Sequence, residues 1–422
     1  MPVFVSMQLW AFPTVTVNPE HVAVAVPMPG DDSANANAQI CLTPSTRISI
    51  RCIPVGKLPS SRFATMVKLS KQPTKVQALV MHPAAANPAN AAIIPTPIKQ
   101  SRMPEIVRSA PNSGYLPAMP PSSASSSNWP ELRVAAWRDT YATLLLYGQI
   151  VGKIRLALTP KLNEWWNVTF YVTARGFTTS PMPYGDRLLS IDFDFIDHRL
   201  VIQDSQGQTR VLPLEAKPVC FFYADVMNAL AEMGPSVHIW PQPQECPVTT
   251  PFSDDREHAH YDRAAVRNYW EALRRIEPVF QQFRARFRGK CSPVHFFWGA
   301  FDLAVSRFVG RRAPERKGKV ERDAYDEEVI SLGFWPGDPW AASGNTDAMF
   351  YSYTVPEPAG LATDPIRPAA AGWNATLKEF VLPYEDVRRA SDPAAAILDF
   401  AQSCYDAGAI RAGWNREALA YP

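Results

Sequence analysis

Apolar and polar residues follow regular patterns from Trp129 onward. Apolar side chains recur at helical spacing over residues 131–152, and Pro130 stands near the first turn, where its missing N–H costs little. A helix is predicted there. The apolar positions that define it are Leu132, Ala136, Tyr141, Leu145 and Ile150.

The next stretch has the texture of antiparallel strands. β-Branched and aromatic residues fill "NEWWNVTFYVTARGF", and a turn is expected at residues 181–185. In "RLLSIDFDF" one face carries Leu189, Ile191, Phe193 and Phe195, and the other carries Ser190, Asp192 and Asp194. This alternation predicts a half-buried strand. A hairpin at Gly207, a helix over 218–233 that ends at Gly234, and a short strand in "SVHIWPQP" complete the first half.

The second half opens with the most strongly patterned helix of the chain, from about Asp262 to Gly289, in which Pro278 is expected to cause a kink. Its predicted apolar face consists of Val266, Tyr269, Trp270, Leu273, Ile276, Phe280, Phe283 and Phe287. Three or four strands should follow, and a last helix is predicted over about 392–411.

These elements predict an α+β fold of antiparallel β-sheets with packed helices. Two units of helix plus strands are expected, at residues 126–250 and 251–422, and one continuous domain over 126–422 is the alternative, since the linker is short.

The stretch before residue 126 has a different composition. Residues 1–128 contain 18 of the 41 prolines and one of the 12 tryptophans, and carry a net charge of +6. Runs rich in Pro, Ala and Ser rarely pack, so residues 1–125 are predicted to be a disordered extension. A start codon assigned too far upstream, with initiation near Met103 or Met119, is our preferred explanation for this extension.

Composition also excludes several classes of protein. No apolar run reaches the roughly 18–20 residues that span a bilayer, so no membrane partner is expected. The Arg-rich helix after Asp262 is a weak nucleic-acid candidate, because residues after 128 carry a net charge of −4. The six cysteines are scattered without a CxxC pair, as is typical of reduced cysteines in a cytoplasmic protein.

The run "GKCSPVHFFWGAFDLAVSRFVGRRAP" mixes ionisable and aromatic residues more densely than any other part of the chain. Buried ionisable groups among aromatic rings need partners, and clefts gather such groups. We therefore predict an aromatic-lined pocket here. Its candidate residues are Lys290, His295, Asp302, Arg307 and Arg311, with Phe297 and Trp298 as lining. The alternative is an aromatic core with arginines at its rim.

Two other groups of residues are weaker candidates. His258 and His260 are two positions apart, so in an extended segment both point to one side and, with His295 and Glu327 or Glu328, would suit a divalent metal. The alternative is a polar loop without metal. Asp192, Asp194, Asp197 and His198 lie close together along the chain, either as an acid–base site or as a solvated face paired with Arg175 and Arg187.

Several of these runs resemble a bacterial family known as domain of unknown function 5996. The resemblance covers about residues 129–414, through "WPELRVAAWRDTYATLLLYGQIVGKIRLALTP", "WWNVTFYVTARGFTTSPMPYG", "FDFIDHRLVI", "GKCSPVHFFWGAFDLAVSRFVGRRAP", "EVISLGFWPG" and "LPYEDVRRA". It implies that His258, Tyr261 and Asp262 match the family pattern and that His260 does not. It also implies a histidine where this chain has Glu327, and often at Leu145, so any site that needs these histidines is altered here. The resemblance implies kinship of fold and no mechanism.

Two interpretations of function follow. In the first, the protein is a cytoplasmic enzyme acting on a small acidic or aromatic metabolite. His295 would be its acid–base group or ligand, Asp302 its orienting carboxylate, and Lys290 and Arg307 its anion contacts. Trp298, Phe297, Arg311 and Tyr261 would bind the ligand, and His258 with Glu328 would hold a metal. In the second, a non-catalytic binding or scaffolding protein uses the same aromatic surface. Convergence of His258, His295 and Glu328 would favour the enzyme, and an exposed aromatic patch would favour the scaffold.

Overall fold

A computed structural model describes residues 37–43, 46–51, 129–234, 236–341 and 347–421. The chain divides into two compact units, one made of residues 11–118 and the other containing residues 119–422. In the first unit, strands β1 (Asn37–Thr43) and β2 (Thr46–Arg51) form an antiparallel pair. The rest of the predicted N-terminal extension, including both proposed start positions, lies outside the described residues.

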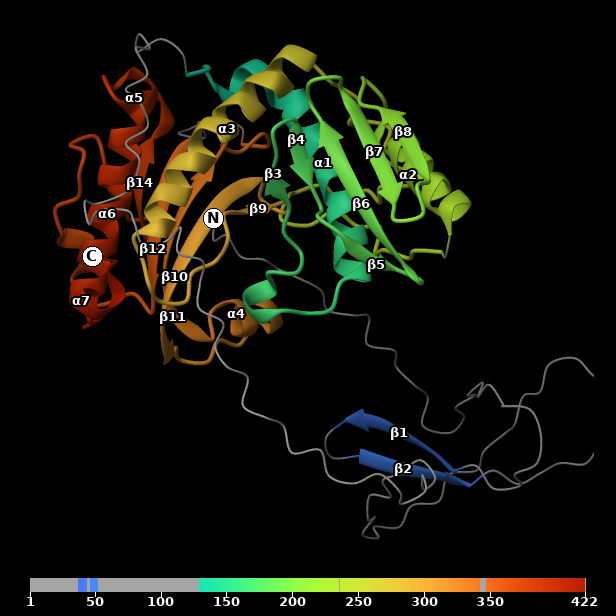
Figure 1. Ribbon diagram of the computed structural model, residues 1–422, viewed down its shortest axis with the longest axis horizontal. Coiled ribbons are helices and arrows are strands. Elements are labelled where there is room, and N and C mark those ends of the chain that lie inside the picture. The colour runs from blue at the N-terminus through green and yellow to red at the C-terminus, as the bar shows by residue number, and fades with distance from the viewer. Residues whose placement is uncertain (1–36, 44–45, 52–128, 235, 342–346, 422) are drawn as a thin grey trace, which may run out of the picture. The chain divides into compact units, whose positions relative to one another are not determined.

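The second unit is built from helices and antiparallel strands (Figure 1). Its helices are α1 (Val134–Leu158), η2 (Asn163–Trp165), α2 (Val219–Met233), α3 (Arg263–Ala285), α4 (Lys319–Ala324), η3 (Leu361–Thr363), α5 (Tyr384–Arg389), α6 (Pro393–Arg411) and α7 (Arg416–Leu419). Its strands are β3 (Tyr171–Val172), β4 (Gly176–Thr178), β5 (Met182–Tyr184), β6 (Arg187–Asp194), β7 (Arg199–Asp204), β8 (Thr209–Pro213), β9 (His295–Phe297), β10 (Asp302–Arg312), β11 (Glu327–Trp335), β12 (Met349–Val355), β13 (Gly372–Asn374) and β14 (Glu379–Pro383). No helix in the described part of the chain combines the length and the apolar character needed to cross a bilayer.

The first sheet has the strand order β3-β4-β6-β7-β8, and β5 pairs with β6. Helices α1 and α2 contact each other and this sheet. The predicted alternation in β6 is confirmed, because Leu189, Ile191 and Phe193 are buried on one face, with Phe195 beyond the strand, while Ser190 and Asp192 are half-buried on the other. Asp194, predicted on the polar face, is itself buried and accepts hydrogen bonds from two arginines.

The second sheet has the order β13-β14-β12-β11-β10-β9, with every neighbouring pair antiparallel. Helices α3 and α6 pack against one face, which we call the helical face. Apolar side chains of the three central strands point to it, for example Leu303, Ile330 and Phe350, all fully buried. Alternate residues of the same strands therefore point to the opposite face.

The two sheets meet at an isolated antiparallel bridge between Phe170 and Phe296. Around it, Phe177 stacks on Phe296 with 4.2 Å between ring centroids, and Phe301 packs edge-on against Phe296. One hydrophobic cluster contains buried residues of both sheets and of α1, α2, α3 and α6. The fold is therefore α+β, as the sequence predicted, with a core that continues across residue 250.

The predicted helices are confirmed with shifted ends. Asp262 caps α3 by accepting from the amides of Ala264 and Ala265, and α3 continues through Pro278. The strand predicted in "SVHIWPQP" is wrong, because residues 236–243 have no regular secondary structure. Pro241 and Pro243 explain this, since proline has no N–H to donate to a neighbouring strand.

Candidate functional site

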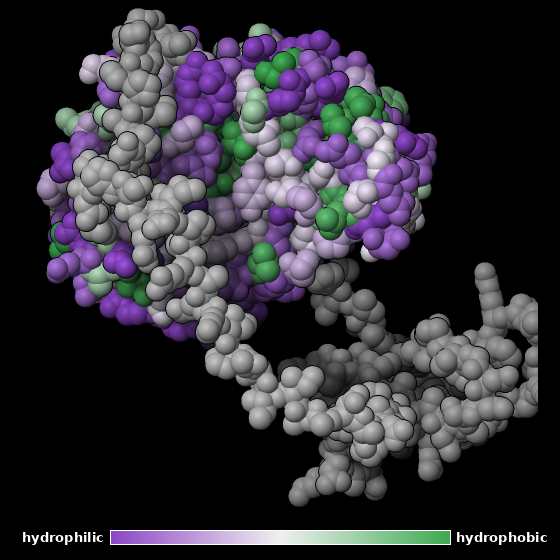
Figure 2. Space-filling view, viewed as in Figure 1, coloured by the Kyte–Doolittle hydropathy of each residue, from purple (hydrophilic) through white to green (hydrophobic). Residues whose placement is uncertain are grey.

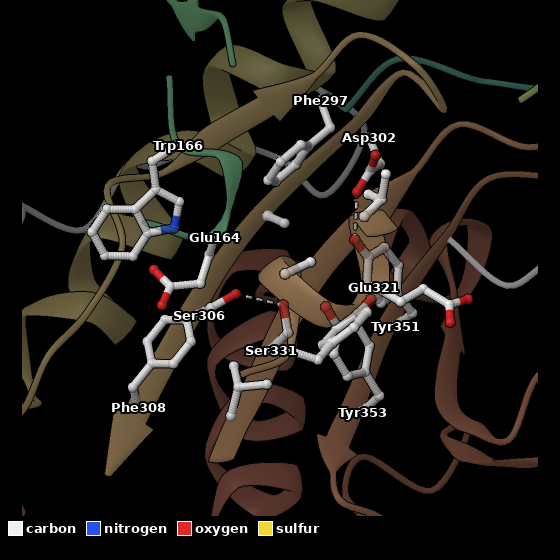
Figure 3. A pocket seen from close by; sticks show the side chains of 15 residues that line it. Glu164, Trp166, Phe297, Asp302, Ser306, Phe308, Glu321, Ser331, Tyr351 and Tyr353 are labelled. Carbon is white, nitrogen blue, oxygen red and sulfur yellow. Dashed lines mark hydrogen bonds between the residues drawn. The ribbon is translucent and has the colours of Figure 1, made fainter. Parts of the chain in front are cut away.

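A pocket lies on the face of the second sheet opposite α3 and α6 (Figure 3). Its floor is formed by β9–β12, and α4 and the η2 segment form its sides. It encloses about 620 Å³, including the part open to solvent. The residues that line it are Glu164, Trp166, Phe297, Asp302, Ala304, Ser306, Phe308, Val320, Glu321, Ala324, Tyr325, Val329, Ser331, Tyr351 and Tyr353.

A carboxyl–phenol pair forms one end of the pocket floor. The Tyr351 hydroxyl on β12 donates to Asp302 Oδ2 on β10 at 2.5 Å, and Tyr351 has to pass over β11 to reach it. It does so at Gly333, where an added Cβ would lie 2.0 Å from Tyr351 Cζ. The missing side chain at Gly333 therefore permits the pair.

Asp302 is only 1% exposed. Burial raises the pKa of its carboxyl to about 6, and the hydrogen bond from Tyr351 only partly offsets this. Beyond the amide of Asp302 itself, no donor among the described residues reaches Oδ1. Leaving a buried acceptor unpaired costs roughly 1–3 kcal/mol, so this oxygen is a position where a ligand's N–H or O–H would be stabilised.

A second carboxyl lies on β14, the strand next to β12. Glu379 on β14 is half-buried, and its pKa rises to about 8 because of burial and repulsion from Asp302. At neutral pH Glu379 is thus mainly protonated while Asp302 is mainly ionised. Two acids in different protonation states stand beside the tyrosines of β12.

Hydroxyl groups connect the middle of the floor. Ser306 on β10 and Ser331 on β11 are cross-strand partners with 2.9 Å between their Oγ atoms, and Tyr353 on β12 is the next partner in register. The Tyr353 hydroxyl hydrogen bonds with Ser331 and with Tyr325, which follows α4. The floor therefore presents a row of polar groups among aromatic rings.

A cluster of charged residues lies at the other end of the pocket. Lys290 Nζ lies 2.6 Å from Glu164 Oε1 and 3.1 Å from Glu327 Oε1. Burial opposes the charge on Lys290, but the hydrogen bonds that its ammonium group donates to these two carboxylates outweigh burial and raise the pKa of Lys290. The ammonium group also lies over the rings of Trp166 and Phe308, at 5.6 and 4.6 Å from their centroids.

Both carboxyls at the ends of the pocket are presented by left-handed backbone. Glu164 itself has φ 46°, its neighbour Trp165 has φ 60°, and Phe301, which precedes Asp302, has φ 64°. Such conformations cost of order 1–3 kcal/mol in residues other than glycine and tend to gather at functional sites. Phe301 is fixed by its contact with Gly148 of α1, where an added Cβ would lie 2.6 Å from the ring.

Three of the predicted site residues lie at this pocket. Phe297 and Asp302 line it, and Lys290 contacts its wall through Glu164. His295 lies next to it but is 1% exposed and is not part of the lining; its Nε2 is 3.5 Å from the Tyr171 hydroxyl. Burial lowers the pKa of His295 to about 3, with smaller contributions from Arg155 and Arg284. His295 is therefore neutral at physiological pH and cannot donate a proton as an imidazolium.

The two residues that were predicted to contact an anion are either already paired or point away from the pocket. Lys290 is bound by two carboxylates. Arg307 lies on the helical face of β10, 1% exposed, with its guanidinium 3.4 Å from the ring centroid of Phe283 and 4.5 Å from that of Tyr405. Alternation along β10 explains this, because Arg307 follows Ser306 and so points to the other side. The placement does not support the predicted acidic ligand.

Two further lining candidates lie elsewhere. Trp298 is buried, its indole donates to the carbonyl of Val168 at 2.7 Å, and its ring packs on Gly152 of α1. Arg311 is exposed and donates to Glu328 and to the Ala412 carbonyl, both at 2.6 Å. Neither residue lines the pocket.

The candidate metal ligands are not brought together. His258 precedes α3, where its Nδ1 lies 2.8 Å from Asp255 Oδ2, and Tyr261 near it contacts His198 at 3.1 Å. Glu328 contacts Trp414 at 3.0 Å, near the far end of α3. The 23 residues of α3 separate the two regions by about 35 Å at 1.5 Å per residue. Among the described residues, no group of three or more His, Cys, Asp or Glu is arranged to hold a metal ion.

Sequence reasoning missed most of the pocket floor. Glu164, Ser306, Ser331, Tyr351 and Tyr353 were not singled out, although four of them carry a recognisable signal. In "DLAVS" and "ISLG" polar or small residues alternate with apolar ones, and in "FYSY" two tyrosines stand two positions apart, so these residues are expected to share one face of each strand. Glu164 carries no such signal.

A comparison with protein families gives one result. The model of a Family of unknown function (DUF5996) matches residues 129–421. The chain belongs to DUF5996. The match confirms the resemblance found in the sequence and includes both sheets of the second unit together with the pocket. No curated protein and no solved structure matches the chain. Membership in DUF5996 supplies no activity, so a function has to be argued from the pocket.

The alternative of a scaffold in this DUF5996 protein predicts a broad aromatic surface. In the visible face of Figure 2, hydrophilic side chains predominate and hydrophobic residues form separate patches. The exposed large aromatic residues among those described are Phe221, Trp240 and Tyr421, which come from α2, the loop after α2 and the C-terminus. Most aromatic rings of the candidate run are instead buried or turned to the pocket.

Proposed function

We propose that this DUF5996 protein binds a small molecule in the pocket between the second sheet and α4. The observation that supports this most directly is Asp302, a buried carboxyl in the pocket lining whose Oδ1 lacks a donor from any other described residue. Buried polar groups in proteins are normally paired, and exceptions gather where a ligand supplies the partner.

The surroundings of Asp302 support the same proposal. The lining combines aromatic rings with a few hydroxyl and carboxyl groups, which is the composition of small-molecule sites. Helix α4 forms one wall and is attached through the Trp165 indole, which donates to the Val320 carbonyl at 3.3 Å. The wall is therefore held in place by contacts outside the floor.

The proposal is tested by filling the pocket from its edge. Ala324 lies on α4 in the lining and is half-buried, so Ala324→Trp places an indole in the pocket with little disturbance of the core. Ala375→Trp, at the exposed turn before β14, is the matched control. Saturation-transfer NMR of the full chain with a set of neutral, cationic and anionic aromatic fragments measures binding.

We expect at least one charge class of fragment to bind the wild type and the Ala375→Trp variant and to lose at least tenfold in affinity in Ala324→Trp. The proposal fails if no fragment binds the wild type, or if binding is equal in both variants.

Catalysis is a second candidate function, favoured by one observation. The pKa of Asp302, about 6, is near the pH at which a general base works well, and Tyr351 is bonded to it. Mass spectrometry of a bound compound after long incubation with the full chain tests this. A compound recovered unchanged by the wild type and by Asp302→Asn alike contradicts a catalytic role.

A further inference from the structure

The charge of the pocket lining selects one class of ligand. Three lining residues are carboxylic acids, Glu164, Asp302 and Glu321, and none of the described lining residues is Lys, Arg or His. Two cations adjoin lining residues: Lys290, which is held between Glu164 and Glu327, and Arg316, whose guanidinium lies 4.6 Å from the ring centroid of Tyr325. The acids of the lining should therefore attract a cationic ligand and repel a carboxylate or phosphate, since the cations lie outside the described lining.

The geometry at Asp302 adds a requirement for a hydrogen-bond donor. Oδ2 accepts from Tyr351, whereas Oδ1 is buried in the lining and has no donor from another described residue. An N–H attached to a positive nitrogen forms a stronger hydrogen bond with a carboxylate oxygen than a neutral donor does. A quaternary ammonium ion has no such hydrogen.

The aromatic rings beside Asp302 fit the same ligand. Phe297 lies on the neighbouring strand, with its residue paired to Asp302 in register, and the rings of Tyr351 and Tyr353 stack with 6.1 Å between centroids. Figure 3 shows Phe297 and Tyr351 on either side of the space next to Asp302. Ring faces attract cations and also accept an apolar group.

We propose that the ligand of this pocket is a small organic ammonium ion, a primary or secondary amine on a compact apolar or aromatic body, whose N–H donates to Asp302 Oδ1. This inference rests on the proposed function, because it names the chemical class that the pocket would bind. A metal ion is a poorer fit, since no group of three or more His, Cys, Asp or Glu in the described part of the chain is arranged to coordinate one.

Four probes of nearly the same shape test the ligand class with the full chain. They are phenethylammonium, its neutral counterpart 2-phenylethanol, the anion 3-phenylpropionate, and N,N,N-trimethylphenethylammonium, which keeps the charge but has no N–H. Dissociation constants are measured by calorimetry at pH 7.5. We expect phenethylammonium to bind at least tenfold more tightly than each of the other three.

Two variants assign the preference to Asp302. Asp302→Asn keeps the shape of the side chain and an acceptor for Tyr351 but removes the charge. It should weaken the binding of phenethylammonium at least tenfold and change the affinity for 2-phenylethanol less than threefold. Asp323→Asn is the control, because Asp323 carries the same charge on α4, does not line the pocket and pairs with Lys161. It should leave both affinities within threefold.

The outcomes separate this inference from the proposed function. If 2-phenylethanol, phenylpropionate or the trimethyl probe binds as tightly as phenethylammonium, the pocket binds small molecules and the inference is overturned. If none of the probes binds the wild type, the inference is overturned, and the fragment experiment with Ala324→Trp then decides the proposed function separately. The wild-type comparison of the four probes holds even if Asp302→Asn does not fold.

Discussion

Single residues decide the shape of the pocket floor. Gly333 is the clearest case, because the ring of Tyr351 occupies the space above it and reaches Asp302 from there. Any side chain at position 333 would have to displace a buried tyrosine that is 4% exposed. Position 333 therefore requires glycine, because a neighbouring ring approaches the backbone closely there.

Substitution of Gly333 by Ala should destabilise the protein by about 1–3 kcal/mol, because the added methyl group overpacks against Tyr351. Gly372→Ala, in β13 of the same sheet, is the control, since nothing lies within 4 Å of its added Cβ. It should change the free energy of unfolding by less than about 0.5 kcal/mol. Urea denaturation of the full chain measures both, and equal effects would contradict the close contact at Gly333.

The carboxyl of Asp302 makes a prediction about pH. Its pKa is about 6 in the folded protein and about 3.9 in an unfolded chain, so the folded state binds the proton more tightly. The contribution of Asp302 to the free energy of unfolding is therefore greatest below about pH 4 and falls as the pH rises to about 6. Each pKa unit corresponds to about 1.4 kcal/mol, which gives a fall of up to about 3 kcal/mol.

The Asp302→Asn variant should not show this decrease in the free energy of unfolding, because asparagine does not titrate. Its stability relative to the wild type should therefore increase between pH 4 and pH 7. Glu379 titrates in both proteins, and the comparison removes most of its effect. Denaturation midpoints at several pH values measure the difference. Parallel pH profiles for the two proteins would show that the carboxyl at position 302 does not titrate as described.

At the scale of elements, α1 supports the site through two glycines one turn apart. Gly148 contacts the ring of Phe301, and Gly152 contacts the ring of Trp298. Both rings belong to the β9–β10 connection that leads into Asp302. The helix thereby approaches this connection closely and holds the start of β10 in place.

Gly152→Ala measures this contact. Alanine favours a helix by about 1 kcal/mol, but its Cβ would lie 2.2 Å from Trp298, whose indole is bonded to Val168 and cannot easily move. We expect a net loss of about 1–2 kcal/mol in the free energy of unfolding, since overpacking outweighs the helix propensity.

Asp139→Ala, at an exposed position of α1, is the comparison and should lie within about 0.5 kcal/mol of the wild type. A stabilised Gly152→Ala variant would contradict the close packing of α1 on Trp298. Chemical denaturation of the full chain gives both values.

At the scale of the whole second unit, one core connects the halves on either side of residue 250. The Phe170–Phe296 bridge and the ion pair between Glu164 and Lys290 both join them, and the buried hydrophobic cluster is shared. A hydrophobic core that is shared in this way is expected to unfold cooperatively.

We therefore expect one cooperative transition for the second unit in calorimetry of the full chain, with equal calorimetric and van't Hoff enthalpies. Phe296→Ala, at the bridge, should lower the midpoint of this transition and leave it a single transition. The free energy of unfolding should fall by about 3–5 kcal/mol. Two resolved transitions assigned to residues 126–250 and 251–422 would instead support two separate domains.

The sequence by itself determined the elements whose apolar spacing is local. The helices α1, α2, α3 and α6 and the alternation of β6 were predicted because a period of 3.6 or 2 residues is visible within one segment. It also pointed to Asp302 and Phe297, which line the pocket, since an unusual mixture of ionisable and aromatic residues surrounds them. Family membership followed from the same runs.

Only the tertiary structure decided which side chains share the pocket. Tyr351 meets Asp302 across β11, and Lys290 meets Glu164 across 126 positions of the chain, so neither contact has a local signal. The direction of Arg307 depends on the face of β10 that α3 covers, and the separation of His258 from Glu328 depends on the length of α3 between their regions. Strand register and helix packing set these distances, because they join residues that no periodicity connects.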